Sequence, residues 1–132
     1  MEFISAEEFL KQPIEVQKVF LDWWKEEKGD LFVLRKEYEK IKHSAEIRCC
    51  NYDLAKMYGI PLFTEGQLRQ FIEDKTNSKA DIIHSKFDGY GVELYENESY
   101  GNYIDGFTDL GENLLQAYWN VALEIAKEKV KA

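Results

Sequence analysis

The sequence predicts an α+β domain in which a small, mainly antiparallel sheet packs against N-terminal, central and C-terminal helices. Helix-start signals recur along the chain, and alternating apolar residues typical of strands lie between the helical segments. The strand candidates between residues 80 and 104 follow one another too closely for the helical crossovers of a parallel sheet. Because 132 residues is an ordinary length for one domain, we expect a single two-layer domain over residues 1–132.

Two helices are expected at the N-terminus. Ser5 is placed as an N-cap, and Glu8 completes a capping box three residues later. Pro13 ends this helix because it lacks a backbone N–H, yet it suits the first turn of a second helix, expected to run to Lys28 and to end at Gly29. We interpret the tryptophans of the second helix as core residues, since large aromatic side chains at helical spacing usually pack inward. Its apolar stripe comprises Val16, Phe20, Trp23 and Trp24.

The middle of the chain is expected to contain short strands and a short helix. Residues 30–35 have a β-rich apolar centre of strand length, and residues 45–50 can supply a partner strand. Residues 36–43, between them, fit either a strand or a helix. A short helix is expected over residues 51–58, closed by Gly59.

A second capping box marks the start of the central helix. Thr64 is the N-cap and Gln67 lies three residues later, while Phe63 and Leu68 occupy the positions of a hydrophobic staple. Residues 60–63 are expected to lead into this helix, which should fray near Asn77.

The second half of the chain is expected to supply three strands and the last helix. The strands are expected near residues 80–85, over residues 90–95 and at residues 103–104. The last helix is expected from about residue 112 to residue 129, with a broad apolar face. Alternation in the second of these strands separates a core-facing set from an outward-facing set, namely Tyr90, Val92 and Leu94 against Gly91, Glu93 and Tyr95.

Negative charge is concentrated in one Gly- and Tyr-rich stretch, residues 88–112. The chain has 17 basic and 25 acidic residues and a net charge of −8. This stretch holds 7 acids and no Lys or Arg, so the other 107 residues hold 18 acids and 17 bases, a net charge of −1. Binding to nucleic acid needs a basic footprint, and we therefore expect no direct nucleic-acid binding.

The sequence also argues against a membrane span, a signal peptide and a disulfide framework. Its longest apolar run is the four residues 31–34, whereas a membrane span needs ~20 and the apolar region of a signal peptide ~7–15. The two cysteines, Cys49 and Cys50, are adjacent and cannot join distant segments. We expect a cytoplasmic protein with no membrane partner.

The histidines and cysteines are candidates for a metal site or a nucleophile. Structural zinc sites space paired cysteines by about two to four residues, so that both thiolates reach one ion, and adjacent cysteines do not meet this need. A Cys–His pair, or Ser85 beside His84, could act as a nucleophile, but neighbouring side chains on a strand point away from each other. We expect no metal and no cofactor from this set, which comprises His43, Cys49, Cys50 and His84.

A small carboxylate- or metal-dependent enzyme remains the alternative for the acidic stretch. Hard cations bind carboxylate oxygens, and paired acids can serve hydrolysis. The EF-hand pattern is absent, however, and an Asp-Gly pair is typical of a turn. An enzyme of this kind would require several acids of the stretch to converge in one cleft, drawn from Asp88, Glu93, Asp105 and Asp109.

Two segments resemble uncharacterised small proteins encoded in phages and prophages of Gram-positive bacteria. The first is Ile60 to Lys75, IPLFTEGQLRQFIEDK, and the second is Asp109 to Trp119, DLGENLLQAYW. Together they cover 27 of the 132 residues. The family has no assigned activity, so the resemblance implies a bacterial cytosolic setting and an accessory or host-interaction role, and it transfers no functional residue.

The composition of residues 88–112 favours a binding surface over catalysis. Tyrosine offers contact area at low entropy cost, and a patch of one sign steers a partner of the opposite sign. A solvated loop with core-facing tyrosines is the other interpretation. We expect a non-catalytic interaction module that binds a basic host or phage protein, with nucleic-acid mimicry as a narrower variant. The candidate binding residues are Glu93, Tyr95, Glu96, Glu98, Tyr100, Tyr103 and Asp105.

Overall fold

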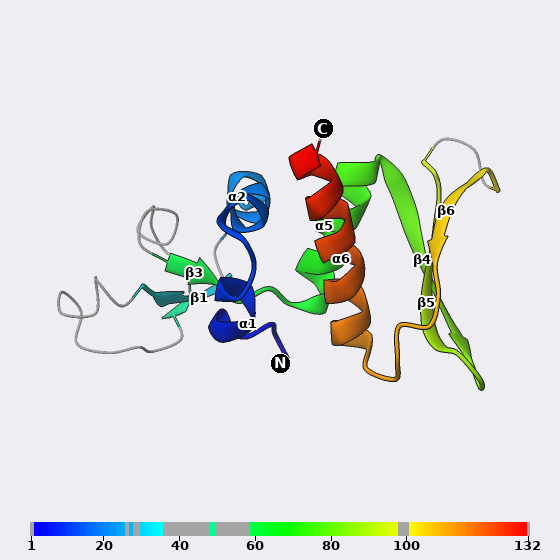
Figure 1. Ribbon diagram of the computed structural model, residues 1–132, viewed down its shortest axis with the longest axis horizontal. Helices are drawn as coiled ribbons and strands as arrows, with labels where there is room; N and C mark the ends of the chain where they lie inside the picture. Colours follow the sequence, from blue (N-terminus) through cyan, green and yellow to red (C-terminus); the bar gives the residue numbers. More distant parts are fainter. Residues whose placement is uncertain are drawn as a thin grey trace. The chain divides into compact units, whose positions relative to one another are not determined.

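The chain forms two compact units, one of residues 3–63 and one of residues 64–132 with the first two residues. Each unit combines helices with an antiparallel three-stranded sheet, so the α+β class is confirmed (Figure 1). The strands are thus divided between two sheets, where one was expected, and the single domain over residues 1–132 stays a prediction. The computed structural model describes residues 2–25, 27, 30–35, 48–49, 59–97 and 101–131.

The sheet of the first unit has the order β2-β1-β3, with β1 (Leu31–Leu34) between β2 (Arg48–Cys49) and β3 (Gly59–Pro61). β3 lies where we expected only a connection to the central helix. Its proline is tolerated because β3 is an edge strand, where a ladder N–H is not needed on both sides. The expectations for residues 36–43 and 51–58 lie outside the described residues.

The two helices of the first unit begin where the sequence predicts. α1 (Ala6–Leu10) is capped by the Ser5 hydroxyl, which accepts the backbone N–H of Glu8 at 3.2 Å. α2 (Ile14–Trp23) follows Pro13 directly. Both starts therefore follow from local chemistry, a capping side chain in one case and the fixed φ of proline in the other.

The predicted end of α2 at Lys28 is wrong, because the helix ends at Trp23. Trp24 already has an extended backbone, with φ −65° and ψ 115°. The Asp30 carboxylate accepts the Trp24 indole N–H at 3.1 Å and the Glu27 backbone N–H at 3.0 Å. The Asp30 carboxylate thus accepts one side-chain and one backbone N–H group from residues just after the end of α2.

The core of the first unit is aromatic and centred on Phe63. Its ring lies 5.7 Å from that of Phe20 and within 6.4 Å of those of Phe9, Trp23 and Trp24. Trp24 is 1% exposed, which confirms its expected place in the core. Such edge and tilted ring contacts stabilise a core beyond simple area burial.

The second unit begins with α5 (Glu65–Thr76), whose capping box is present as predicted. The Thr64 hydroxyl accepts the Gln67 N–H, and the Gln67 side chain accepts the Thr64 N–H at 3.0 Å. Asn77 ends the helix in the left-handed conformation, with φ 50°. Asparagine tolerates this conformation better than most residues, so the chain turns sharply here into the sheet.

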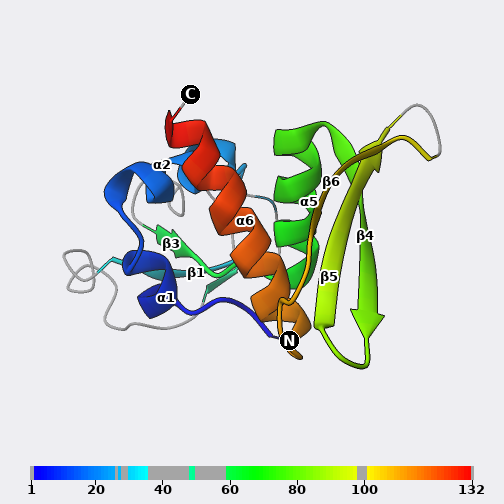
Figure 2. The same ribbon diagram turned by 45° about the vertical axis from the view of Figure 1, so that its right-hand side comes forward.

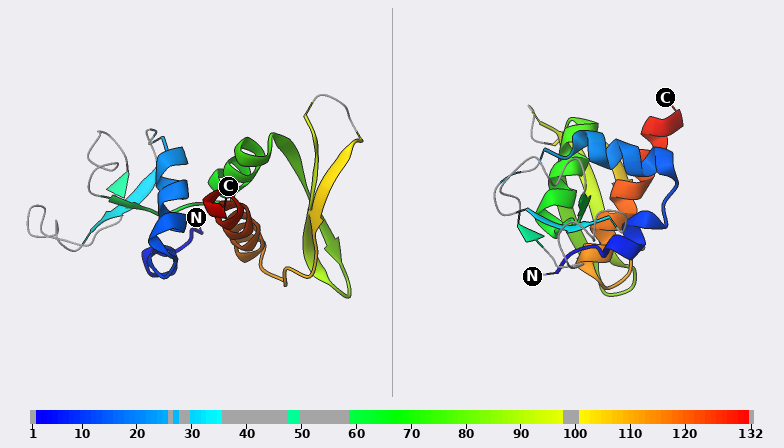
Figure 3. Two further views of the ribbon diagram at one scale, coloured as in Figure 1. Left: turned by 45° about the horizontal axis from the view of Figure 1, so that its top comes forward. Right: turned by 90° about the vertical axis from the view of Figure 1, so that its left-hand side faces the viewer.

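The sheet of the second unit consists of β4 (Ser78–Ser85), β5 (Gly89–Glu96) and β6 (Tyr103–Phe107) in the order β4-β5-β6. α6 (Leu114–Lys131) follows, and the Asn113 side chain accepts the Gln116 N–H at its start. α5 packs against β4 and α6, and α6 also packs against β5 (Figure 2). Among the described residues of this unit, no helix covers the face of the sheet that is turned away from α5 and α6 (Figure 3).

Candidate functional site

The side of the β4-β5-β6 sheet that faces away from α5 and α6 is the first candidate site, and we call it the outer face. Val92 and Leu94 of β5 are buried on the helix side, while the alternate residues Glu93 and Tyr95 are partly exposed. This is the predicted alternation. Residues that pair across neighbouring strands lie on the same face of a sheet. The outer face therefore comprises Lys79, Asp81, Ile83, Gly91, Glu93, Tyr95, Tyr103 and Gly106.

A pair of tyrosines from β5 and β6 forms the aromatic part of the outer face. The rings of Tyr95 and Tyr103 lie 6.0 Å apart with their planes at 76°, an edge-to-face contact. The Tyr95 hydroxyl donates to Glu93 Oε2 at 2.7 Å. This bond, with further contributions from burial and the nearby carboxylates of Glu93 and Asp81, raises the pKa of Tyr95 above its ordinary value. Tyr103 is 58% exposed and available to a partner.

Two glycines allow large side chains to lie flat on the outer face. A Cβ on Gly106 would be 2.5 Å from Tyr103 Oη, so the tyrosine ring lies over this glycine. A Cβ on Gly91 would be 2.9 Å from Ile83 Cγ1 and 3.0 Å from the Phe107 carbonyl oxygen. The missing side chains thus make room for Tyr103 over Gly106 and for Ile83 beside Gly91, and we call these two exposed side chains the apolar platform.

Two acidic residues face each other across neighbouring strands of the outer face. Asp81 and Glu93 are directly paired across β4 and β5. Like charges at such positions destabilise a sheet. Within the described part of the chain, neither carboxylate forms an ion pair, although Lys79 lies two residues before Asp81 on the same face.

The outer face continues into a hollow of about 420 Å³ at its β4 side. Residues of the face, of the β5–β6 turn region and of α5 line this hollow. They are Arg69, Lys79, Asp81, Tyr95, Glu96, Asn97 and Gly101.

Both edges of this sheet carry side chains that occupy backbone groups. At the β4 edge, Arg69 donates to the Ala80 carbonyl at 2.7 Å, and Glu73 accepts the Ala80 N–H at 2.9 Å. At the β6 edge, the Asp105 carboxylate accepts the Gly106 N–H at 2.8 Å. β6 also contains a bulge at Ile104, since Asp105 pairs with Leu94 but Tyr103 pairs with Tyr95. Such devices discourage the addition of another strand.

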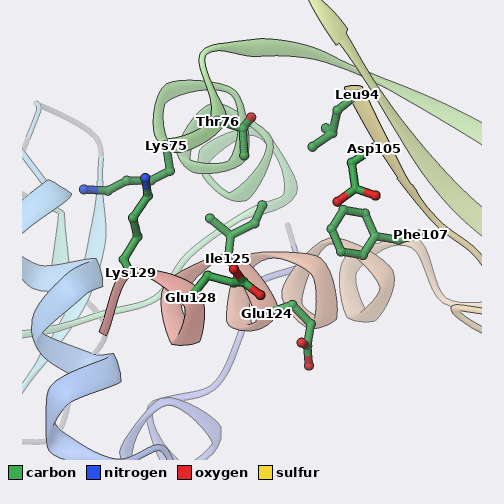
Figure 4. Close-up of a pocket in the computed structure, with 9 residues that line it drawn as sticks. All are labelled: Lys75, Thr76, Leu94, Asp105, Phe107, Glu124, Ile125, Glu128 and Lys129. Carbon is green, nitrogen blue, oxygen red and sulfur yellow. The ribbon is translucent and has the colours of Figure 1, made fainter. Parts of the chain in front are cut away.

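The second candidate site is a groove of about 420 Å³ on the other side of the sheet, which we call the inner groove. Figure 4 shows Asp105 and Phe107 projecting into it from the sheet side, opposite the side chains of α6. Its lining comes from α5, β5, β6 and α6. The lining residues are Lys75, Thr76, Leu94, Asp105, Phe107, Glu124, Ile125, Glu128 and Lys129.

The structure separates the predicted binding residues. Glu93, Tyr95 and Tyr103 lie together on the outer face, whereas Asp105 lies in the inner groove. Glu96, at the end of β5, accepts the Asn102 side-chain N–H at 3.0 Å and lines the hollow beside the outer face. Glu98 and Tyr100 lie outside the described residues. The residues of the acidic stretch therefore lie on more than one surface of the protein.

Of the catalytic and metal candidates, the structure describes the side chains of His84 and Ser85, which are neighbours in β4. His84 lies 2.8 Å from Glu112 and stacks edge-on with Tyr90 at 4.7 Å. His43 and Cys50 lie outside the described residues, as does the side chain of Cys49. Among the residues that the structure describes, no group of three or more His, Cys, Asp or Glu side chains is placed to hold a metal ion.

The convergence of acids required by a carboxylate enzyme is found only in part. Glu93 and Asp105 lie on opposite faces of the sheet, so these two carboxylates do not share a cleft. Asp88 lies in the β4–β5 turn, and Asp109 lies in the segment after β6 with a left-handed φ of 58°. The acids that do share the inner groove with Asp105 come from α6, far along the chain.

The candidate residues predicted from the sequence do not include Asp81 or the α6 side of the inner groove. The signal for Asp81 was present, because alternation in β4 places Lys79, Asp81 and Ile83 on the face opposite Ala80. Glu124 and Glu128 carried no comparable signal, since only the packing of α6 against β5 brings them near β6.

The comparisons with known proteins add no relative. No protein-family model, curated protein or solved structure matches this chain. In the described part of the chain, none of the helices has the length and apolar character needed to cross a membrane.

Proposed function

We propose that this protein is a non-catalytic interaction module that docks a basic segment of another protein on its outer face. The observation that carries the proposal is the directly paired Asp81 and Glu93 beside the Tyr95–Tyr103 pair. An arginine or lysine from a partner would place positive charge between the two carboxylates and remove their repulsion. The partner's cation would thus give these two carboxylates an ion-pair partner.

The aromatic rings support the same partner chemistry. A cation over a tyrosine face gains about 0.5–1 kcal/mol at an exposed site and more when water is excluded. Ile83 is 41% exposed and, with Tyr103, offers apolar area for the carbon stem of a long basic side chain. Carboxylates, rings and apolar platform therefore favour the same kind of side chain.

Docking on the face is favoured over addition of a strand at an edge. Arg69 and Glu73 occupy the backbone groups of Ala80 at one edge, and Asp105 occupies the Gly106 N–H at the other. A partner strand would have to displace these bonds, whereas the outer face presents its side chains directly.

The biological setting is part of the proposal. The resemblance of residues 60–75 and 109–119 to small phage and prophage proteins supports an accessory role in the bacterial cytosol. The partner we propose is a host or phage protein with a basic surface. A patch of one charge raises the rate at which a partner of the opposite charge associates with it.

Charge reversal on the outer face tests the proposal. An oligo-arginine peptide is titrated into the protein by calorimetry at low and at physiological salt. We expect Asp81→Lys and Glu93→Lys each to weaken binding by about tenfold, and more at low salt, since exposed charges are screened as ionic strength rises. Proteins from a bacterial lysate can then be compared by how strongly each displaces the bound peptide.

Asp88→Lys is the matched control, because it changes the net charge equally at an exposed residue of the β4–β5 turn. It should retain most of the affinity. Equal losses for Asp88→Lys and Glu93→Lys, with both variants folded by circular dichroism, would mean that only total charge matters, and the proposal would then fail.

A further inference from the structure

The inner groove combines an apolar floor with charges of both signs. Leu94 and Ile125 are buried at its base, 2% and 6% exposed, and Phe107 is half-buried beside them. Its volume of about 420 Å³ lies within the usual ~300–1,000 Å³ of ligand sites. The floor can therefore accept an apolar group of one or two side chains.

The five charged side chains that line the groove are not neutralised by one another. Within the described part of the chain, no ion pair joins any of them. The lysines come from the last turns of α5 and α6, and the acids come from β6 and α6. In Figure 4 the lysines lie at the opposite side of the groove from Asp105 and Phe107. They are Lys75, Lys129, Asp105, Glu124 and Glu128.

We propose that the inner groove binds the C-terminal end of a peptide, with an apolar last residue and a basic residue shortly before it. The free carboxylate would meet Lys75 and Lys129, and the apolar side chain would lie on Leu94, Phe107 and Ile125. The basic side chain would meet Asp105 and the acids of α6. A zwitterionic segment of this kind satisfies both signs of charge and the apolar floor together.

The two signs distinguish this ligand from simpler ones. An apolar ligand would bury unpaired lysines and carboxylates at its ends, which costs free energy. A purely basic ligand would leave Lys75 and Lys129 facing it with like charge. The carboxylate is therefore the decisive feature of the proposed ligand, and a peptide C-terminus supplies it.

This inference is independent of the proposed function, because the inner groove and the outer face lie on opposite sides of the sheet. The probe is the acetylated peptide Gly-Lys-Leu-Phe with a free carboxylate, compared by calorimetry with the same peptide carrying a C-terminal amide. We expect the free acid to bind about tenfold or more tightly than the amide, since the amide removes one charge-assisted contact. This comparison uses the unaltered protein, so folding of a variant does not affect it.

Charge reversal locates the contact. Lys129→Glu should weaken binding of the free acid and abolish the difference between acid and amide, and Lys75→Glu should do the same. Lys131→Glu is the matched control, because this exposed lysine is in the same last turn of α6 but does not line the groove. Glu93→Lys, on the outer face, should bind the peptide as the unaltered protein does.

Three results would overturn the inference: no saturable binding of the free acid, equal affinity for acid and amide, or an acid-to-amide ratio that Lys129→Glu and Lys75→Glu leave unchanged. Because Glu93→Lys tests only the outer face, loss of oligo-arginine binding in that variant with intact peptide binding separates the two sites. The reverse pattern is expected for Lys129→Glu.

Discussion

The two faces of the β4-β5-β6 sheet are built from the same strands, but one face is part of the core and the other is exposed. On the helix side, Ala80, Val92 and Leu94 are almost completely buried. On the outer face, Glu93 and Tyr95 alternate with Val92 and Leu94 along β5 and remain partly exposed. Alternation along a strand thus lets one short segment contribute both to the core and to a surface that is available for binding.

The largest expected effect contrasts a core residue with an outer-face residue. Leu94→Ala should lower the free energy of unfolding by about 2–5 kcal/mol, because it removes buried methyl groups and leaves a cavity. Tyr103→Ala, on the outer face, should cost about 1 kcal/mol or less, since its cross-strand ring contact is exposed. Urea denaturation monitored by tryptophan fluorescence measures both. Equal costs would show that the two faces are not energetically distinct.

A smaller effect is expected at Gly91, beneath the outer-face platform. Gly91→Ala places a Cβ 3.0 Å from the backbone carbonyl of Phe107, which cannot move without disturbing β6, so we expect a loss of about 1–3 kcal/mol. Gly66→Ala, in α5, meets no atom within 4 Å and should stabilise the protein by about 0.5–1 kcal/mol through helix propensity. Thermal unfolding of both variants checks the sign. A stabilised Gly91→Ala would contradict the tight packing of the platform.

The smallest expected effect is a change in the titration of Tyr95. The hydrogen bond to Glu93 raises the pKa of Tyr95 above the ordinary 10.0, so the folded state holds this proton more tightly than the unfolded state. The resulting stabilisation is complete below pH 10 and is lost as the pH rises through the folded pKa. Glu93→Gln should lower this pKa, measured from tyrosinate absorbance with Tyr95→Phe as the reference. An unchanged titration would contradict the hydrogen bond between Tyr95 and Glu93.

Much of the fold could be predicted from residues that act locally. Ser5 and Thr64 start their helices by binding backbone N–H groups three residues away, and the alternation around Glu93 follows from the geometry of one strand. The end of α2 could not be predicted in this way. Just after this end, the Asp30 carboxylate accepts the Trp24 indole N–H, a contact that the helical pattern of the sequence does not reveal.

The outer face, too, could be predicted only where it depends on residues close together in the sequence. Glu93 and Tyr95 were placed on one exposed face by their spacing alone, and the structure adds Tyr103 through strand pairing. Asp105 was grouped with them because it is nearby in sequence, yet the bulge at Ile104 and the register of β6 place it on the other face.

Local sequence patterns were sufficient to predict the α+β class, the helix starts and the inward and outward sets of β5, because each depends on a few neighbouring residues. Tertiary structure alone decided that Asp81 faces Glu93, that Tyr103 lies over Gly106, and that α6 closes one side of the inner groove. These arrangements join residues distant in the chain, so they depend on register and packing rather than on local preference.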